Sequence, residues 1–148
     1  MATFDWSRED NRCFGCGDNP IGLELDFTRE DDWIVARTKL RNLYQGFKNS
    51  AHGGIIATLL DEASAWAAMA KTGRVSPSYE LECKFLQPVP LEEEITVRAK
   101  VIERKHGIAK TKAEVRDKDD QVLAKAEITC RVLDEKMDGI QGELTRDQ

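Results

Sequence analysis

Residues 52–71 read HGGIIATLLDEASAWAAMAK, and this stretch decides the fold. Its Ala, Leu and Met content favours a helix over 55–71, with Gly53 and Gly54 at its start and Gly73 just past its end. Apolar residues lie on all sides of this helix rather than on one stripe. A helix of that kind is buried, so we expect a sheet to wrap around it.

The segments on either side of the helix alternate apolar and polar residues with a period of two. This pattern predicts strands over 22–30, 32–40, 79–85, 95–101, 109–115 and 122–132. The first two strands should form a hairpin around Asp31–Asp32. Alternation gives each strand one buried and one wet face, as in an antiparallel sheet. The sequence therefore predicts an α+β fold with two strands, a helix and then four strands.

The chain length bounds the domain organisation. A chain of 148 residues and 16.7 kDa fits one domain of ordinary size, so a two-domain enzyme is not expected. Residues 1–12 and 134–148 are polar and have no clear period. We expect both ends to lie outside the core, which leaves 13–133 as the folded domain.

Charge and hydropathy exclude several classes of partner. The 22 Lys and Arg residues against 27 Asp and Glu residues give a net charge of −5, which argues against a nucleic-acid-binding surface. No apolar run reaches the roughly 18 residues of a membrane span. The first residues, MATFDWSREDNR, lack the basic and apolar regions of a signal peptide. We therefore expect a cytoplasmic protein with no nucleic-acid or membrane partner and with reduced cysteines.

The predicted helix carries two acidic residues, Asp61 and Glu62. A buried carboxylate is costly unless it is paired, neutralised or functional. Asp61 is a candidate general base or nucleophile toward a carbonyl, or else a carboxylate in a water-filled dimer crevice with no chemistry. Glu62 lies about 100° further round the helix, so the two acids cannot both face one site. One of them is expected to be a structural hydrogen-bond partner.

The helix opens with His52, Gly53 and Gly54. Free backbone N–H groups and the positive end of the helix dipole can bind developing negative charge at such a terminus. Two glycines also let a ligand approach the backbone closely. The alternative is that the glycines only allow a sharp turn and that His52 is an ordinary loop residue.

Three stretches carry a resemblance to a known family: CFGCGDNPIGL at 13–23, AHGGIIATLLDEASAWAA at 51–68 and FLQPVPL at 85–91. The chain resembles the hotdog-fold acyl-CoA thioesterases of the PaaI-like branch, related to the 4-hydroxybenzoyl-CoA thioesterases. The resemblance covers 12–133, and its most specific part is HGG with an acid nine positions after the histidine in an apolar helix. It implies a hotdog fold and hydrolysis of an acyl-CoA to a free acid and coenzyme A, without metal or cofactor.

The resemblance also implies roles for individual residues. The backbone N–H of Gly53 would polarise the thioester carbonyl, and Asp61 would activate water or attack directly. His52 would order the loop or the substrate. Ser78 stands where many relatives have a threonine that holds the nucleophilic water.

The expected substrate-binding positions of this chain differ in part from those of the relatives it resembles. Relatives often carry Asn or Gln six or seven residues before the HGG, where this chain has Gly46 and Gln45. Gln45 is therefore the expected partner of the carbonyl, with Asn49 as its competitor. Gly54 and Glu62 complete the set of expected substrate contacts.

The spacing of these groups has a consequence for assembly. Gly53 and Asp61 are eight positions apart, which is roughly 12 Å along one helix. One Asp side chain cannot bridge that distance, so the two groups can act on one thioester only if they come from different chains. Two helices packed antiparallel across a two-fold axis meet this condition. We therefore expect a homodimer, and the resemblance implies a homotetramer in many relatives.

The Cys13-x2-Cys16 pair has the spacing of half a structural zinc site. The second half would have to come from Cys83, Cys130 or His106. A lone CxxC is a weak signal, so no metal is expected and the two thiols should help fix the loop before the first strand. Cys83 and Cys130 lie on apolar strand faces and are predicted to be small core residues.

Other functional classes lack their motifs. The chain has no GxSxG elbow and no GxGxxG or GxxxxGK[ST] phosphate loop. Hotdog hydratases have an Asp-x4-His pair, whereas the residues five before His52 and His106 are Phe47 and Val101. The remaining alternative is an acyl-thioester-binding hotdog protein without turnover, because a fold does not fix a function.

Overall fold

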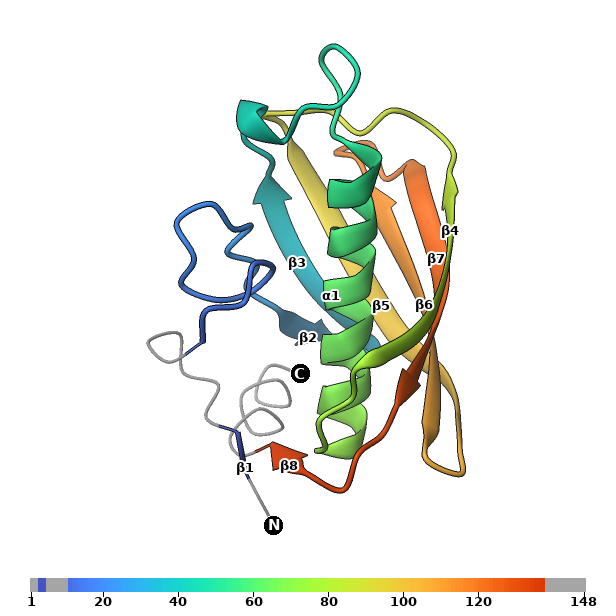
Figure 1. The fold of residues 1–148 in the computed structure, drawn as a ribbon. Coiled ribbons are helices and arrows are strands. Elements are labelled where there is room, and N and C mark those ends of the chain that lie inside the picture. The colour runs from blue at the N-terminus through green and yellow to red at the C-terminus, as the bar shows by residue number, and fades with distance from the viewer. Residues whose placement is uncertain (1–2, 5–10, 138–148) are drawn as a thin grey trace.

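The computed structural model describes residues 3–4 and 11–137. Its main feature is a six-stranded antiparallel sheet with the order β2-β3-β5-β6-β7-β4 and one long helix, α1, on its concave side (Figure 1). The elements of this unit are β2 (Thr28–Glu30), β3 (Trp33–Lys39), η1 (Asn42–Tyr44), α1 (Gly53–Thr72), β4 (Ser78–Phe85), β5 (Glu94–Lys105), β6 (Ile108–Arg116) and β7 (Val122–Arg131). A short parallel pair joins β1 (Thr3–Phe4) to β8 (Lys136–Met137). The predicted α+β fold is confirmed.

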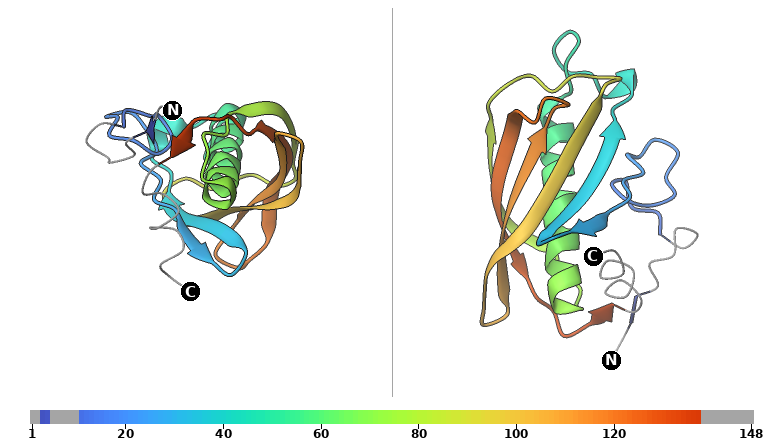
Figure 2. Two further views of the ribbon diagram at one scale, coloured as in Figure 1. Left: turned by 90° about the horizontal axis from the view of Figure 1, so that it is seen from below. Right: turned by 180° about the vertical axis from the view of Figure 1, so that it is seen from behind.

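The curved sheet wraps around α1, as the end-on view in Figure 2 shows. Leu59, Leu60, Ala63 and Ala68 of the helix are fully buried against it. The two acids of the helix, Asp61 and Glu62, are both half-buried. Among the helices of the described residues, none is long and apolar enough to cross a membrane.

Both ends of α1 are capped. At the N-terminus His52 has extended backbone angles, and its Nδ1 accepts a hydrogen bond of 2.9 Å from the backbone N–H of Gly54. At the C-terminus Gly73 adopts a left-handed conformation with φ of 69°, and its N–H donates to the carbonyl of Met69. The glycine predicted to end the helix is therefore its C-cap.

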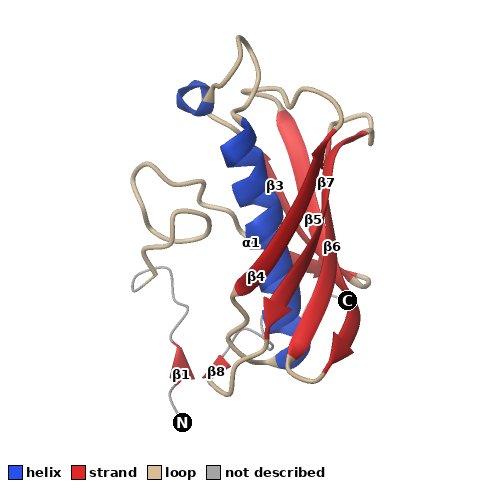
Figure 3. Ribbon diagram, turned by 45° about the vertical axis from the view of Figure 1, so that its right-hand side comes forward, coloured by secondary structure: helices blue, strands red, loops and turns tan. Residues whose placement is uncertain are grey.

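The predicted alternation is confirmed in β6, in the first half of β5 up to Ala99 and in β7 from Ala124 on, where every second residue is buried. It is wrong for β4. Tyr79, Leu81 and Phe85 are 61%, 43% and 55% exposed, and only Cys83 is half-buried. The reason is the position of β4 at the edge of the sheet (Figure 3). Arg131 lies over the Tyr79 ring, but the side chains of β4 stay largely open to solvent.

The first predicted strand is shorter than expected. Leu23, Leu25 and Phe27 are buried, but β2 begins only at Thr28. Glu24 has a φ of 50°, which interrupts an extended strand, and the N–H groups of Leu23 and Leu25 donate to the loop carbonyls of Phe14 and Gly15. Residues 11–27 therefore form a loop that packs against the core.

The C-terminal segment also departs from expectation. Met137 is 5% exposed and belongs to the hydrophobic core, although the sequence places residues from 134 outside it. Its backbone N–H donates to the carbonyl of Gly73, so the chain returns to the end of α1. Residues 138–148 lie outside the described residues.

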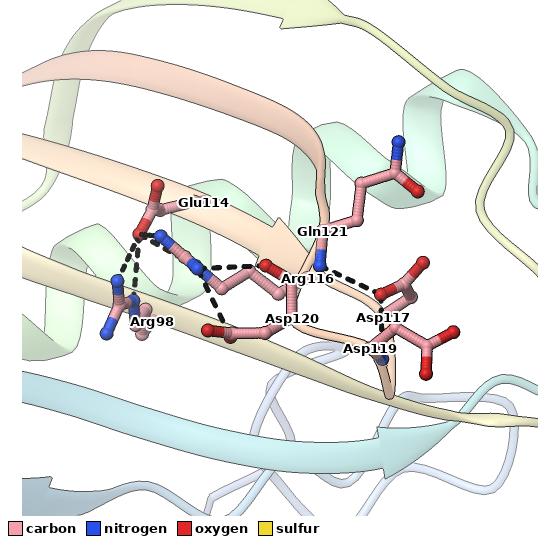
Figure 4. Close-up of polar contacts among 7 residues, drawn as sticks. All are labelled: Arg98, Glu114, Arg116, Asp117, Asp119, Asp120 and Gln121. Carbon is pink, nitrogen blue, oxygen red and sulfur yellow. Dashed lines mark hydrogen bonds and ion pairs between the residues drawn. The ribbon is translucent and has the colours of Figure 1, made fainter.

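Charged side chains form hydrogen bonds and ion pairs on the outer side of the sheet near the β6–β7 turn (Figure 4). Glu114 accepts from both Arg98 and Arg116, and Asp117 accepts from the backbone N–H groups of Asp119 and Gln121. The aspartate-rich segment 117–120 therefore forms the turn that the sequence predicts.

The N-cap gives a stability prediction. Replacing His52 by Ala removes the acceptor for the Gly54 N–H and should lower the free energy of unfolding by about 1 kcal/mol. The conservative change His52→Asn supplies a short acceptor and should restore most of that loss. Urea unfolding at one fixed protein concentration measures both variants. Equal losses for Ala and Asn would contradict a capping role.

Candidate active site

The N-terminus of α1 presents one backbone donor to solvent. His52 accepts from Gly54, and the N–H groups of Ile55 and Ile56 donate to the carbonyl of His52. The N–H of Gly53 has no acceptor among the described residues. Gly53 is thus the free donor that this helix end offers to an oxyanion, whereas the Gly54 donor is occupied by the cap.

The loop before the helix is held by local contacts. The side chain of Gln45 accepts from the backbone N–H of Asn49 at 3.0 Å, and Asn49 has a φ of 63°. The backbone of Gly46 lies against His52, where a Cβ would come within 2.8 Å of the His52 Cα. Gln45, Asn49 and His52 are all exposed, so this loop lies at the solvent-facing start of the helix.

Two turns further along α1, Asp61 meets the first residue of β4. The Ser78 hydroxyl donates to Asp61 Oδ1. The structure thus brings together Asp61 and Ser78, which are 17 positions apart in the sequence. A carboxylate that accepts from a hydroxyl retains its second oxygen for another proton donor, such as a water molecule.

Two thiols that the sequence assigned to the core lie close to this carboxylate. The pKa of Cys130 is raised to about 11, mainly by burial and also by the Asp61 charge, while a hydrogen bond with Ser78 opposes the increase. Burial and the Asp61 charge also raise the pKa of Cys83. Both cysteines therefore stay protonated at neutral pH. Cys130 is fully buried, which confirms its place in the core.

Glu62 faces a different part of the molecule. It meets the loop of residues 11–27, where Cys13 Sγ lies 3.2 Å from Glu62 Oε1. Burial is the main cause that raises the pKa of Glu62, while hydrogen bonds from Cys13 and Cys16 oppose it. Burial and the Glu62 charge also raise the pKa of the Cys16 thiol, to about 12. Glu62 thus has structural partners, and it does not share a site with Asp61.

The expected site residues therefore fall into two groups on one helix. His52, Gly53, Gly54 and the Gln45–Asn49 loop gather at its start, while Asp61 and Ser78 lie two turns away. Strand β4 runs between the groups, because its last residue, Phe85, lies beside Gly53. The sequence did not identify Phe85 as a neighbour of the helix start, since a strand pattern does not say which helix residue it passes.

Comparisons with known proteins agree with this architecture. A family model of the thioesterase superfamily matches residues 48–124. Among curated proteins, none matches this chain in sequence. A solved thioesterase superfamily protein is 25% identical with a TM-score of 0.68, and the match covers 74% of this chain and 56% of that one. This chain therefore spans little more than half the length of that relative.

Two further solved structures share the fold at lower identity. The PaaI protein of the E. coli phenylacetic acid degradation operon has a TM-score of 0.71 at 18% identity, over 78% of this chain and 83% of that one. A Streptococcus mutans protein, bound to acetyl-CoA, has a TM-score of 0.69 at 20% identity, over 76% and 90% of the two chains. The family model covers just over half of the chain. The helix and sheet of this chain match those of the solved relatives. The chain belongs to the thioesterase superfamily, and it has the hotdog fold of these solved structures.

Proposed function

We propose that this protein hydrolyses a small or medium acyl-CoA to the free acid and coenzyme A. The observation that carries the proposal is the pair of groups on α1: a free Gly53 N–H at its start and the Asp61–Ser78 pair two turns on. Relatives with bound ligands support the ligand class, since the Streptococcus mutans protein holds acetyl-CoA and a Streptococcus pneumoniae protein holds coenzyme A.

In this mechanism Asp61 is the general base. It takes a proton from a water molecule held beside Ser78 while the water oxygen bonds to the thioester carbonyl carbon. The negative charge that develops on the carbonyl oxygen is stabilised by the Gly53 N–H at the positive end of the helix. The carbon–sulfur bond then breaks, the sulfur leaves with the electron pair, and the proton passes from Asp61 to the thiolate.

The remaining residues would position these groups. His52 fixes the helix start through its bond to Gly54, so that the Gly53 N–H points outward. The amide nitrogen of Gln45 is available as a donor toward the thioester, because its oxygen already accepts from Asn49. Both Gln45 and His52 are exposed, so a substrate can reach them.

One chain cannot complete this mechanism. Eight residues of helix separate Gly53 from Asp61 by about 12 Å, which exceeds the reach of a carboxylate to a carbonyl bound at Gly53. The complete site would therefore combine Gly53 from one chain with Asp61 from another. A homodimer is the smallest assembly with this property, and a pair of dimers would form a tetramer.

The edge strand β4 suits such a dimer. In the described residues β4 pairs with β7 alone, so its outer edge is free. Ser78 at its start contacts Asp61, and Phe85 at its end lies beside Gly53. Antiparallel pairing of two β4 edges across a two-fold axis would set each Ser78 end beside the other chain's Phe85 end. That arrangement brings Asp61 of one chain toward Gly53 of the other and covers the exposed apolar side chains of β4.

The catalytic role of Asp61 can be tested directly. Asp61→Asn keeps the shape and removes the base, so the rate of thiol release from acyl-CoA esters should fall by about a hundredfold or more. The matched change Asp119→Asn lies in the exposed β6–β7 turn (Figure 4) and should leave the rate unchanged. Equal activity of wild type and Asp61→Asn would contradict the proposal. An inactive wild type that binds acyl-CoA tightly would identify a binding protein instead.

A mixing experiment tests the shared site. Gly53→Pro removes the N–H at the first helical position, where proline is tolerated and where the extended His52 backbone already suits a following proline. Gly53→Ala keeps the N–H, and its Cβ would meet only the Phe85 ring at 3.9 Å, so it is the matched control. Both Asp61→Asn and Gly53→Pro should be inactive alone. An equal mixture after subunit exchange should recover about a quarter of wild-type activity, since half of the dimers are mixed and each has one intact site.

Subunit exchange is verified with two different affinity tags, by capturing one variant and detecting the other. Exchanged mixtures that stay as inactive as the two parents would contradict a site built from two chains. A folded protein that stays monomeric at micromolar concentration would contradict it as well.

A further inference from the structure

Three potential metal ligands from two distant parts of the chain meet beside α1. Cys13 and Cys16 come from the loop of residues 11–27, and Glu62 comes from the helix. The two sulfur atoms and a carboxylate oxygen all lie within 4.8 Å of one another. Cys16 is 6% exposed, while Cys13 and Glu62 are half-buried. The sequence named Cys83, Cys130 or His106 as possible further ligands, whereas the fold supplies Glu62, which lies 46 positions beyond Cys16.

The loop turns its backbone and side-chain donors toward the sulfur atoms. The Gly15 N–H donates to Cys13 Sγ at 3.3 Å, and the Asn11 amide donates to Cys16 Sγ at 3.4 Å. Asn11 also accepts from the Cys13 N–H at 2.9 Å, and the Gly17 N–H donates to the Cys13 carbonyl. Donors aimed at sulfur stabilise the thiolate form, and outer-shell hydrogen bonds of this kind orient metal ligands.

Gly15 lets the loop approach the carboxylate. It is buried, and a Cβ built on it would overlap the Cγ and Cδ atoms of Glu62. The absence of a side chain at Gly15 therefore allows the carboxylate and the two thiols to converge on one point.

The carboxylate of Glu62 also lacks a cationic partner in the described part of the chain. The ion pairs of that part join other residues, mostly on the outer side of the sheet. A half-buried carboxylate beside two sulfur atoms is strongly stabilised by a divalent cation. Thiolate ligands select zinc and other thiophilic ions over magnesium and calcium.

We propose that Cys13, Cys16 and Glu62 bind a zinc ion, with a water molecule as the fourth ligand. A tetrahedral zinc site with Zn–S near 2.3 Å and Zn–O near 2.1 Å has sulfur–oxygen and sulfur–sulfur edges of about 3.6 and 3.8 Å. The Cys13–Glu62 distance of 3.2 Å and the 4.8 Å limit on the whole set match these edges after shifts of up to about 1 Å. The ion would join the 11–27 loop to α1 at the residue next to Asp61, and it takes no part in the thioesterase step proposed above.

The metal content of the full-length protein tests the site. Protein purified without chelators should contain about one zinc ion per chain, and cobalt substituted for zinc should show thiolate-to-cobalt charge-transfer absorption. Cys13→Ser, Cys16→Ser and Glu62→Gln should each weaken zinc affinity at least about tenfold, measured by competition with a chromophoric chelator. The matched changes Cys83→Ser and Glu82→Gln lie on β4 and should leave it unchanged.

The cobalt spectrum keeps the test decisive if a ligand variant unfolds, because it is recorded on the wild-type chain. A wild-type protein that takes up neither zinc nor cobalt would overturn the proposal. So would unchanged affinity in Glu62→Gln, or a metal-free protein in which Cys13 and Cys16 form a disulfide. None of these measurements depends on thioesterase activity, so this proposal can fail while the proposed function stands.

Discussion

A single rigid helix sets the geometry on which the other features of this protein depend. Because α1 rises about 1.5 Å per residue, the Gly53 N–H and the Asp61 carboxylate stay roughly 12 Å apart along it. The curved sheet fixes the position of α1 by burying Leu59, Leu60 and Ala63. The helix can neither shorten nor bend to bring these two groups to one carbonyl. A second chain is therefore the means by which the proposed site becomes complete.

Strand β4 connects this constraint to assembly. It touches both ends of the reactive region, with Ser78 at Asp61 and Phe85 at Gly53, and it is an edge strand. Full burial of a large apolar side chain gains about 1.5–3 kcal/mol, and the apolar side chains of β4, which are about half exposed, would each gain roughly half of that. An unpaired strand edge is also a ready surface for another strand. The same pairing would thus bury β4 and complete two sites.

The sequence predicts the parts of the fold that follow from local periodicity. The helix of residues 53–72, its C-cap at Gly73 and the alternation of β5, β6 and β7 are all visible in the pattern of apolar residues. The exposure of β4 is not, because alternation shows which residues share a face but not whether anything covers that face. The left-handed Glu24 and the return of Met137 to the core are likewise tertiary effects without a local signal.

The two neighbouring acids show the same limit within the site. Helical geometry alone separates Asp61 from Glu62, but only the fold directs Asp61 to Ser78 and Glu62 to Cys13.

The central claim is that one acyl-CoA is held by two chains. A crystal structure with a hydrolysis-resistant acyl-CoA analogue tests it most directly. The account predicts the analogue's carbonyl oxygen about 3 Å from the Gly53 nitrogen of one chain, with Asp61 of the partner subunit facing the carbonyl carbon. An analogue that contacts Gly53 and Asp61 of the same chain, or neither, would contradict it.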